Sequence, residues 1–100
     1  MIKHITRDER FLAMAKELGF DIYDENPAGG HYAPLLRHDN ELYLSGLVPR
    51  MKGKVQYPGR VGLELNLADA QEAASISAIR GLALIREAVG SLENVKAVLR

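Results

Sequence analysis

Apolar residues recur at helical spacing in the first part of the chain. Thr6 comes just before this segment and Glu9 follows three positions later, which is the pattern of a helix capping box. Gly19 comes directly after the last apolar position, where a helix commonly ends. The pattern predicts a helix over residues 7–18. Its apolar positions are Phe11, Leu12, Ala15 and Leu18.

A longer helical pattern begins near Asn66 or Leu67 and ends at Gly90. Asn66 is a suitable cap, and Asp69 lies in the first turn, where the helix dipole favours a negative charge. One apolar stripe consists of Ala78, Ile79, Leu82, Ile85 and Val89. A second stripe has small residues, which would let the helix lie close against a sheet: Ala70, Ala74, Ser77, Gly81 and Ala88. Glycine in a helix costs about 1 kcal/mol relative to alanine, so we expect Gly81 to have a packing reason.

Between the two helices, two extended runs flank a polar turn. Residues 31–37 form the first run, in which Pro34 favours an edge or irregular strand. Asp39 and Asn40 provide the turn, and residues 41–48 form the second run. The pattern predicts a β-hairpin. In the second strand Leu42, Leu44 and Gly46 share one face, and Glu41, Tyr43 and Ser45 share the other.

The remaining segments are mostly irregular. Residues 24–30 form a linker rich in turn residues, and residues 49–62 form a loop in which 55–57 could be a short strand. Residues 95–100 alternate as a further strand does. The expected elements make an α+β domain, but they do not complete a layered structure. Either other chains complete the sheet, or the sequence is the front piece of a longer one.

The composition argues against nucleic-acid binding, cysteine-based sites, secretion and membrane insertion. The 100 residues balance 13 basic against 13 acidic side chains, whereas nucleic-acid binders usually carry a basic excess. There is no cysteine, hence no disulfide or thiolate metal site. The N-terminus lacks the apolar run of a signal peptide, and no stretch approaches the roughly 20 apolar residues of a membrane span. We therefore expect a cytoplasmic protein with no membrane partner.

Several short strings, in this order, resemble the YjgF/RidA/L-PSP family of reactive-intermediate deaminases. They are Gly30-His31-Tyr32-Ala33-Pro34, Asn40-Glu41-Leu42-Tyr43-Leu44-Ser45-Gly46, the helix end up to Gly90, and Ser91-Leu92-Glu93-Asn94-Val95-Lys96. The resemblance implies that residues 1–29 are an N-terminal helical extension with a linker. It also implies that residues 30–100 are the front part of the family domain. The implied fold is a sheet of the bacillary chorismate-mutase type under a long helix, in a homotrimer. The family's C-terminal helix and last strands have no counterpart here.

The resemblance also implies a chemistry. Active members hydrolyse enamines and imines, such as 2-aminoacrylate, to keto acids in pockets between subunits, without a cofactor. The ligand bears a carboxylate. Tyr32, Ser45 and Gly46 match pocket-lining positions, and Leu47 stands where the family commonly has glutamine. The family's carboxylate-binding arginine and its catalytic glutamate lie in the part without counterpart. The alternatives are a trimer that binds a small metabolite without catalysis, or an inactive truncated product.

Other groups of polar residues are weaker candidates for a functional site. His4, His31 and His38 lack the spacing of metal ligands, so we expect no metal site. Ser45 with His38 and Asp39 is a poor candidate for a catalytic triad, since residues joined by one turn rarely reach that geometry. The basic residues of segment 50–54 are typical of a solvated loop. They do not favour the ribonuclease activity that was formerly assigned to the family.

Overall fold

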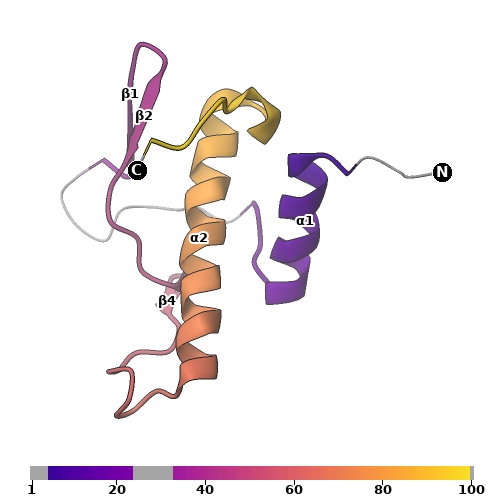
Figure 1. Cartoon of the computed structure of the whole chain (residues 1–100). Helices are drawn as coiled ribbons and strands as arrows, with labels where there is room; N and C mark the ends of the chain where they lie inside the picture. Colours follow the sequence, from indigo (N-terminus) through magenta and orange to yellow (C-terminus); the bar gives the residue numbers. More distant parts are fainter. Residues whose placement is uncertain (1–4, 24–32, 100) are drawn as a thin grey trace.

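The computed structural model describes residues 5–23 and 33–99. These residues form an α+β arrangement in which α1 lies beside the much longer α2, with two small antiparallel sheets on the other side of α2 (Figure 1). The expected α+β class is confirmed. The elements in chain order are α1 (Arg7–Leu18), β1 (Leu35–His38), β2 (Glu41–Leu44), β3 (Arg50–Met51), β4 (Lys54–Val55), α2 (Leu67–Val89) and the short 3-10 helix η1 (Leu92–Asn94).

Both long helices have the predicted ends. At the start of α1, the Thr6 hydroxyl accepts a hydrogen bond from the backbone N–H of Glu9 at 3.1 Å. Gly19 then ends the helix in the left-handed conformation, with φ of 73°. These local bonds satisfy backbone groups that a helix terminus leaves without partners. The bounds predicted for this helix are confirmed.

The start of α2 is a complete capping box. The Asn66 side chain accepts from the N–H of Asp69 at 2.9 Å, and the Asp69 carboxylate accepts from the N–H of Asn66 at 3.2 Å. At the other end, the Gly90 N–H donates to the carbonyl of Arg86 at 2.7 Å. The predicted start and stop of α2 are both confirmed.

Strands β1 and β2 form the predicted hairpin around the turn at Asp39 and Asn40. Leu35 pairs with Leu44 at the open end, and His38 pairs with Glu41 at the turn. Both strands are shorter than residues 31–37 and 41–48, the predicted runs, although 31 and 32 lie outside the described residues. The ladder ends at Leu35 because Pro34, the next residue, has no N–H to donate.

A second hairpin was not predicted. Strand β3 pairs with β4, so that Arg50 faces Val55 and Met51 faces Lys54. Lys52 and Gly53 form the turn with φ of 53° and 74°, the positive pair typical of a type I′ hairpin turn. The prediction of a strand at 55–57 is therefore wrong beyond Val55. The chain leaves the extended conformation by Tyr57, whose φ is 54°.

The strand predicted over residues 95–100 is also wrong within the described part. Residues 95–99 form no ladder. Instead, the Arg7 guanidinium from α1 donates to the carbonyls of Val95 at 2.5 Å and Leu92 at 3.2 Å. A side chain thus occupies a backbone acceptor that a neighbouring strand would otherwise use.

The core lies between α1 and α2. Its buried cluster consists of Phe11, Ala15, Phe20, Ile79 and Leu92. Of the predicted apolar stripe on α2, Ile79 is buried, but Ala78 and Leu82 remain exposed. Helix α1 therefore supplies core side chains itself. It does not simply cover a finished domain.

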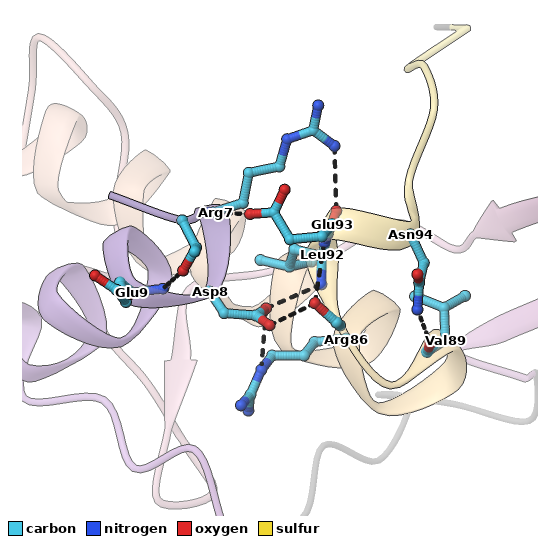
Figure 2. Close-up of polar contacts among 10 residues, drawn as sticks. Arg7, Asp8, Glu9, Arg86, Val89, Leu92, Glu93 and Asn94 are labelled. Atoms are coloured by element: carbon cyan, nitrogen blue, oxygen red, sulfur yellow. Dashed lines mark hydrogen bonds and ion pairs between the residues drawn. The ribbon is translucent and has the colours of Figure 1, made fainter. Parts of the chain in front are cut away.

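A polar cluster, which we call the Asp8 clasp, joins α1 to the end of α2 (Figure 2). Asp8 accepts hydrogen bonds from the Ser91 hydroxyl at 2.5 Å and from the Leu92 N–H at 2.9 Å. Arg86 Nε lies 3.3 Å from the same carboxylate, as an ion pair without hydrogen-bond geometry. The Arg86 guanidinium also lies 5.7 Å from the centre of the Phe11 ring, which is within cation–π range.

Candidate ligand site at the end of strand β2

Three of the four predicted site residues lie in the described part of the chain. Ser45, Gly46 and Leu47 follow β2 directly, where the chain leaves the hairpin and passes along α2. The fourth, Tyr32, lies outside the described residues. The segment of residues 45–48, which we call the exit segment, is the candidate site.

Ser45 is fixed to the chain that enters β1. Its N–H donates to the carbonyl of Pro34 at 3.1 Å, and its hydroxyl donates to the carbonyl of Ala33 at 2.6 Å. The hydroxyl proton is therefore used within the fold. The hydroxyl oxygen can still accept a hydrogen bond from a ligand.

Leu47 packs against α2 at Gly81. A Cβ atom built on Gly81 would lie 3.0 Å from Leu47 Cδ1 and 3.5 Å from Leu44 Cδ1. The first distance is tighter than ordinary van der Waals contact. The packing reason expected for Gly81 is thus present, since only glycine lets the exit segment approach this closely without adjustment. Leu47 is half-buried, with at least part of its side chain turned toward the helix.

Arg80 anchors the other end of the exit segment. Its Nη1 donates to the carbonyl of Val48 at 2.5 Å, and the residue is only 4% exposed. Arg80 was not among the residues predicted for the site. The sequence did contain a signal for this role, since Arg80 lies between Ile79 and Gly81 in an apolar part of the helix. An arginine at such a position indicates a polar partner, because arginine is rarely buried without one.

Two backbone donors of the exit segment have no acceptor within residues 5–23 and 33–99. In the part of the chain that the structure describes, neither the N–H of Gly46 nor that of Leu47 donates a hydrogen bond. The preceding Ser45 N–H and the following Val48 carbonyl both have partners. An N–H group that has no acceptor among the described residues can donate to an anionic oxygen of a ligand, next to the Ser45 hydroxyl oxygen.

Other chemistries find little support in the geometry. His38 lies at the turn of the hairpin, opposite Glu41, and Ser45 lies beyond the open end, so the two residues are roughly 14 Å apart at strand spacing. His38 instead lies 3.8 Å from Asp39, with both side chains exposed. The triad residues are therefore not brought together. Residues 5–23 and 33–99 also contain no group of three or more His, Asp or Glu side chains able to hold a metal ion.

Two tyrosines carry raised pKa values because each is hydrogen-bonded to a carboxylate. Glu72 accepts from the Tyr57 hydroxyl, and Glu41 accepts from the Tyr43 hydroxyl. The raised pKa of each tyrosine keeps its phenol protonated at neutral pH. Neither is therefore suited to act as a general base there.

Comparisons with known proteins identify a similar structure but no family. No family model and no curated protein matches the chain. Among solved structures, the protein Atu1372 from Agrobacterium tumefaciens, of unknown function, is similar with a TM-score of 0.69 and 34% identity. The match covers 88% of this chain and 54% of that protein, so the chain spans about half of its length. No helix of the described residues is long and apolar enough to cross a membrane.

Proposed function

We propose that the exit segment binds a small carboxylate-bearing enamine or imine, and that the protein hydrolyses it to a keto acid in the cytoplasm. The observation that carries this proposal is that the N–H groups of Gly46 and Leu47 have no acceptor among the described residues. A ligand carboxylate accepts from the Gly46 N–H, and a charge-assisted bond of this kind is about twice as strong as a neutral one. The resemblance to the YjgF/RidA/L-PSP family supports the same assignment.

The reaction makes modest demands on the protein. Protonation of the enamine carbon gives an imine, and water then adds to the carbon of the C=N bond. The resulting carbinolamine loses ammonia as its C–N bond breaks, which leaves the keto acid. Because an imine is already electrophilic, holding the carboxylate in a fixed position next to a water molecule supplies much of the rate gain.

We further propose that the pocket is completed by other copies of the chain, in a trimer with a sheet of the chorismate-mutase type. Within the described residues, β1 and β2 pair only with each other, and an isolated two-stranded hairpin is marginally stable in water. Leu36 is 63% exposed and Tyr43 is 56% exposed on this hairpin. Both features support a partner along the hairpin.

A substitution that removes one N–H tests the proposal. A dehydratase acting on serine generates 2-aminoacrylate, and its loss is followed with and without the protein. Gly46→Pro deletes the donor, whereas Gly46→Ala keeps it. A Cβ on Gly46 meets no atom within 4 Å, so alanine fits. We expect wild type and Gly46→Ala to accelerate the loss and Gly46→Pro to be at least about ten-fold slower, as for lost oxyanion donors.

The control for folding is the circular dichroism spectrum and oligomeric state of each variant. Equal rates for Gly46→Pro and Gly46→Ala, with both proteins folded, would remove the exit segment from the reaction. A monomer in light scattering at micromolar concentration would contradict the trimer.

A second candidate function is binding without catalysis. It is favoured by the side chains of the exit segment, because Leu47 and Val48 are apolar and the Ser45 proton is already donated to Ala33. No acid or base side chain belongs to this segment. This function predicts saturable binding of a stable keto acid, weakened by Gly46→Pro but not by Gly46→Ala, with no acceleration of 2-aminoacrylate loss.

A further inference from the structure

An apolar groove lies on the side of α2 that faces α1, away from the exit segment. It runs between the two helices and the chain that follows η1, and its volume is about 710 Å³. Figure 1 shows α1 and that following chain on either side of the upper part of α2. The apolar floor includes Phe11 and Met14 from α1, and Leu82 and Ile85 from α2. Sites for small organic ligands commonly have volumes of roughly 300–1,000 Å³.

The floor is partly open to solvent. Met14 is 42% exposed and Leu82 is 37% exposed, while Phe11 beside them is buried. Leu82 belongs to the apolar stripe predicted for α2, so this is the part of the stripe that α1 leaves uncovered. Apolar surface in a concave site gains free energy when a ligand removes it from water.

The charged side chains that line the groove, among the residues the structure describes, are all cationic. The charged side chains that line it are Arg7, Arg10 and Lys96, although the whole chain balances 13 basic against 13 acidic residues. Arg7 already donates to the carbonyls of Leu92 and Val95. The side chains of Arg10 and Lys96 make no hydrogen bond or ion pair among the described residues. The charge complement of this groove is therefore an anion.

Among the described residues, neutral polar side chains are nearly absent from the lining. Ser75 is the neutral polar side chain there, and its hydroxyl donates to the carbonyl of Gln71 at 3.0 Å. An extended peptide would bring amide groups that need partners, and burying them without partners costs free energy. A hydrocarbon chain has no such groups. The lining therefore favours a long apolar chain with one anionic end.

We propose that this groove binds a long-chain carboxylate of the fatty-acid type. Its methylene chain lies on Phe11, Leu82 and Ile85, and its carboxylate pairs with Arg10 and Lys96. This site is separate from the exit segment, and the proposal does not depend on the hydrolysis proposed above.

Head-group chemistry tests the charge requirement. Dodecanoate, dodecanol and dodecylammonium are titrated into the whole chain by calorimetry, each below its micellar concentration. We expect saturable binding of one dodecanoate per chain, and binding about five-fold weaker or more for the neutral and cationic analogues, since two ion pairs are lost. Absence of saturable binding, or equal affinity for the three analogues, overturns the proposal.

Variants locate the binding. Arg10→Ala with Lys96→Ala should weaken dodecanoate binding by about five-fold or more, and Leu82→Asp, which puts a like charge on the floor, by more than about ten-fold. Lys54→Ala removes a cation on β4 that does not line the groove, and should leave the affinity unchanged. Leu82 is partly exposed, and thermal unfolding of each variant verifies that it is folded. Equal weakening by Lys54→Ala, or none by the groove variants, places the ligand elsewhere and overturns the proposal.

Discussion

The carboxylate of Asp8, in the first turn of α1, accepts a hydrogen bond from the hydroxyl of Ser91, which lies 83 positions later and just beyond α2. This bond and its neighbours in Figure 2 hold the start of α1 against η1. Asp8 also caps the backbone N–H of Leu92. The Asp8 side chain on α1 thus accepts two hydrogen bonds, one from a side chain and one from the backbone, at the end of α2.

The clasp predicts a pH dependence of stability. Hydrogen bonds from Ser91 and the Leu92 N–H, with a smaller contribution from the Arg86 charge, hold the pKa of Asp8 below its usual value of 3.8. A lowered pKa in the folded state means that the stabilisation is fully present above the unfolded pKa and is lost as pH falls through the folded one. Asp8→Asn should lower the midpoint of thermal unfolding at pH 7, and the difference from wild type should shrink below pH 3.8. The matched control is Glu17→Gln, on the same helix; an equal loss there at pH 7 would contradict the role of the clasp.

Phe11 tests whether α1 belongs to the core. Phe11 is 3% exposed and lies under the Arg86 guanidinium. Phe11→Ala should reduce the free energy of unfolding by about 3–5 kcal/mol, a loss large enough to unfold much of the protein. Leu12→Ala, at a position that is 38% exposed, should cost less than about 1 kcal/mol. Urea titration measures both, and similar losses would mean that α1 is only peripherally attached.

The contact between Leu47 and Gly81 predicts non-additive substitutions. In wild type, Gly81→Ala gains about 1 kcal/mol of helix propensity but places its Cβ 3.0 Å from Leu47 Cδ1. We expect these effects to offset each other to within about 0.5 kcal/mol. In a Leu47→Ala background the methyl group is accommodated, so Gly81→Ala should stabilise by about 1 kcal/mol. A double-mutant cycle of unfolding free energies with no coupling would disprove the close approach.

The capping box of α2 predicts a specific cost. Asn66→Ala removes the acceptor for the Asp69 N–H and should cost about 1 kcal/mol of stability. Asn66→Ser retains an acceptor oxygen and should cost only a few tenths. Thermal unfolding of the two variants provides the comparison. Equal losses would show that the side-chain size of Asn66, and not its hydrogen bond, stabilises the helix start.

The sequence predicted those features whose causes are local. Thr6 and Asn66 cap α1 and α2 through bonds spanning three residues, and Gly19 and Gly90 end them through their own backbone conformations. The first hairpin was predicted for the same reason, since its turn is two residues long. The strand lengths were overestimated, because a ladder ends where a particular donor is missing, as at Pro34.

Features that depend on distant segments escaped the sequence analysis. One face of α2 carries three buried residues, Ile76, Arg80 and Leu84. Because Arg80 is charged, the pattern of apolar residues alone did not predict that this face is buried. Val95 is extended in conformation, yet its carbonyl is bound by Arg7 from the first helix. At the candidate site, the position of the exit segment was predictable, whereas its fixation by Arg80 required the fold.

The separation of Asp8 from Ser91 along the sequence also bears on the order of folding. Bringing Asp8 and Ser91 together closes a loop of 83 residues. This closure costs chain entropy before the hydrogen bonds of the Asp8 clasp can offset it. Helix α2 and η1 adjoin in sequence and can form with far shorter loops, so we expect them to precede the docking of α1. Breaking the clasp should therefore accelerate unfolding far more than it slows folding. Helix α1 is synthesised before α2, but it would then dock after α2 has formed.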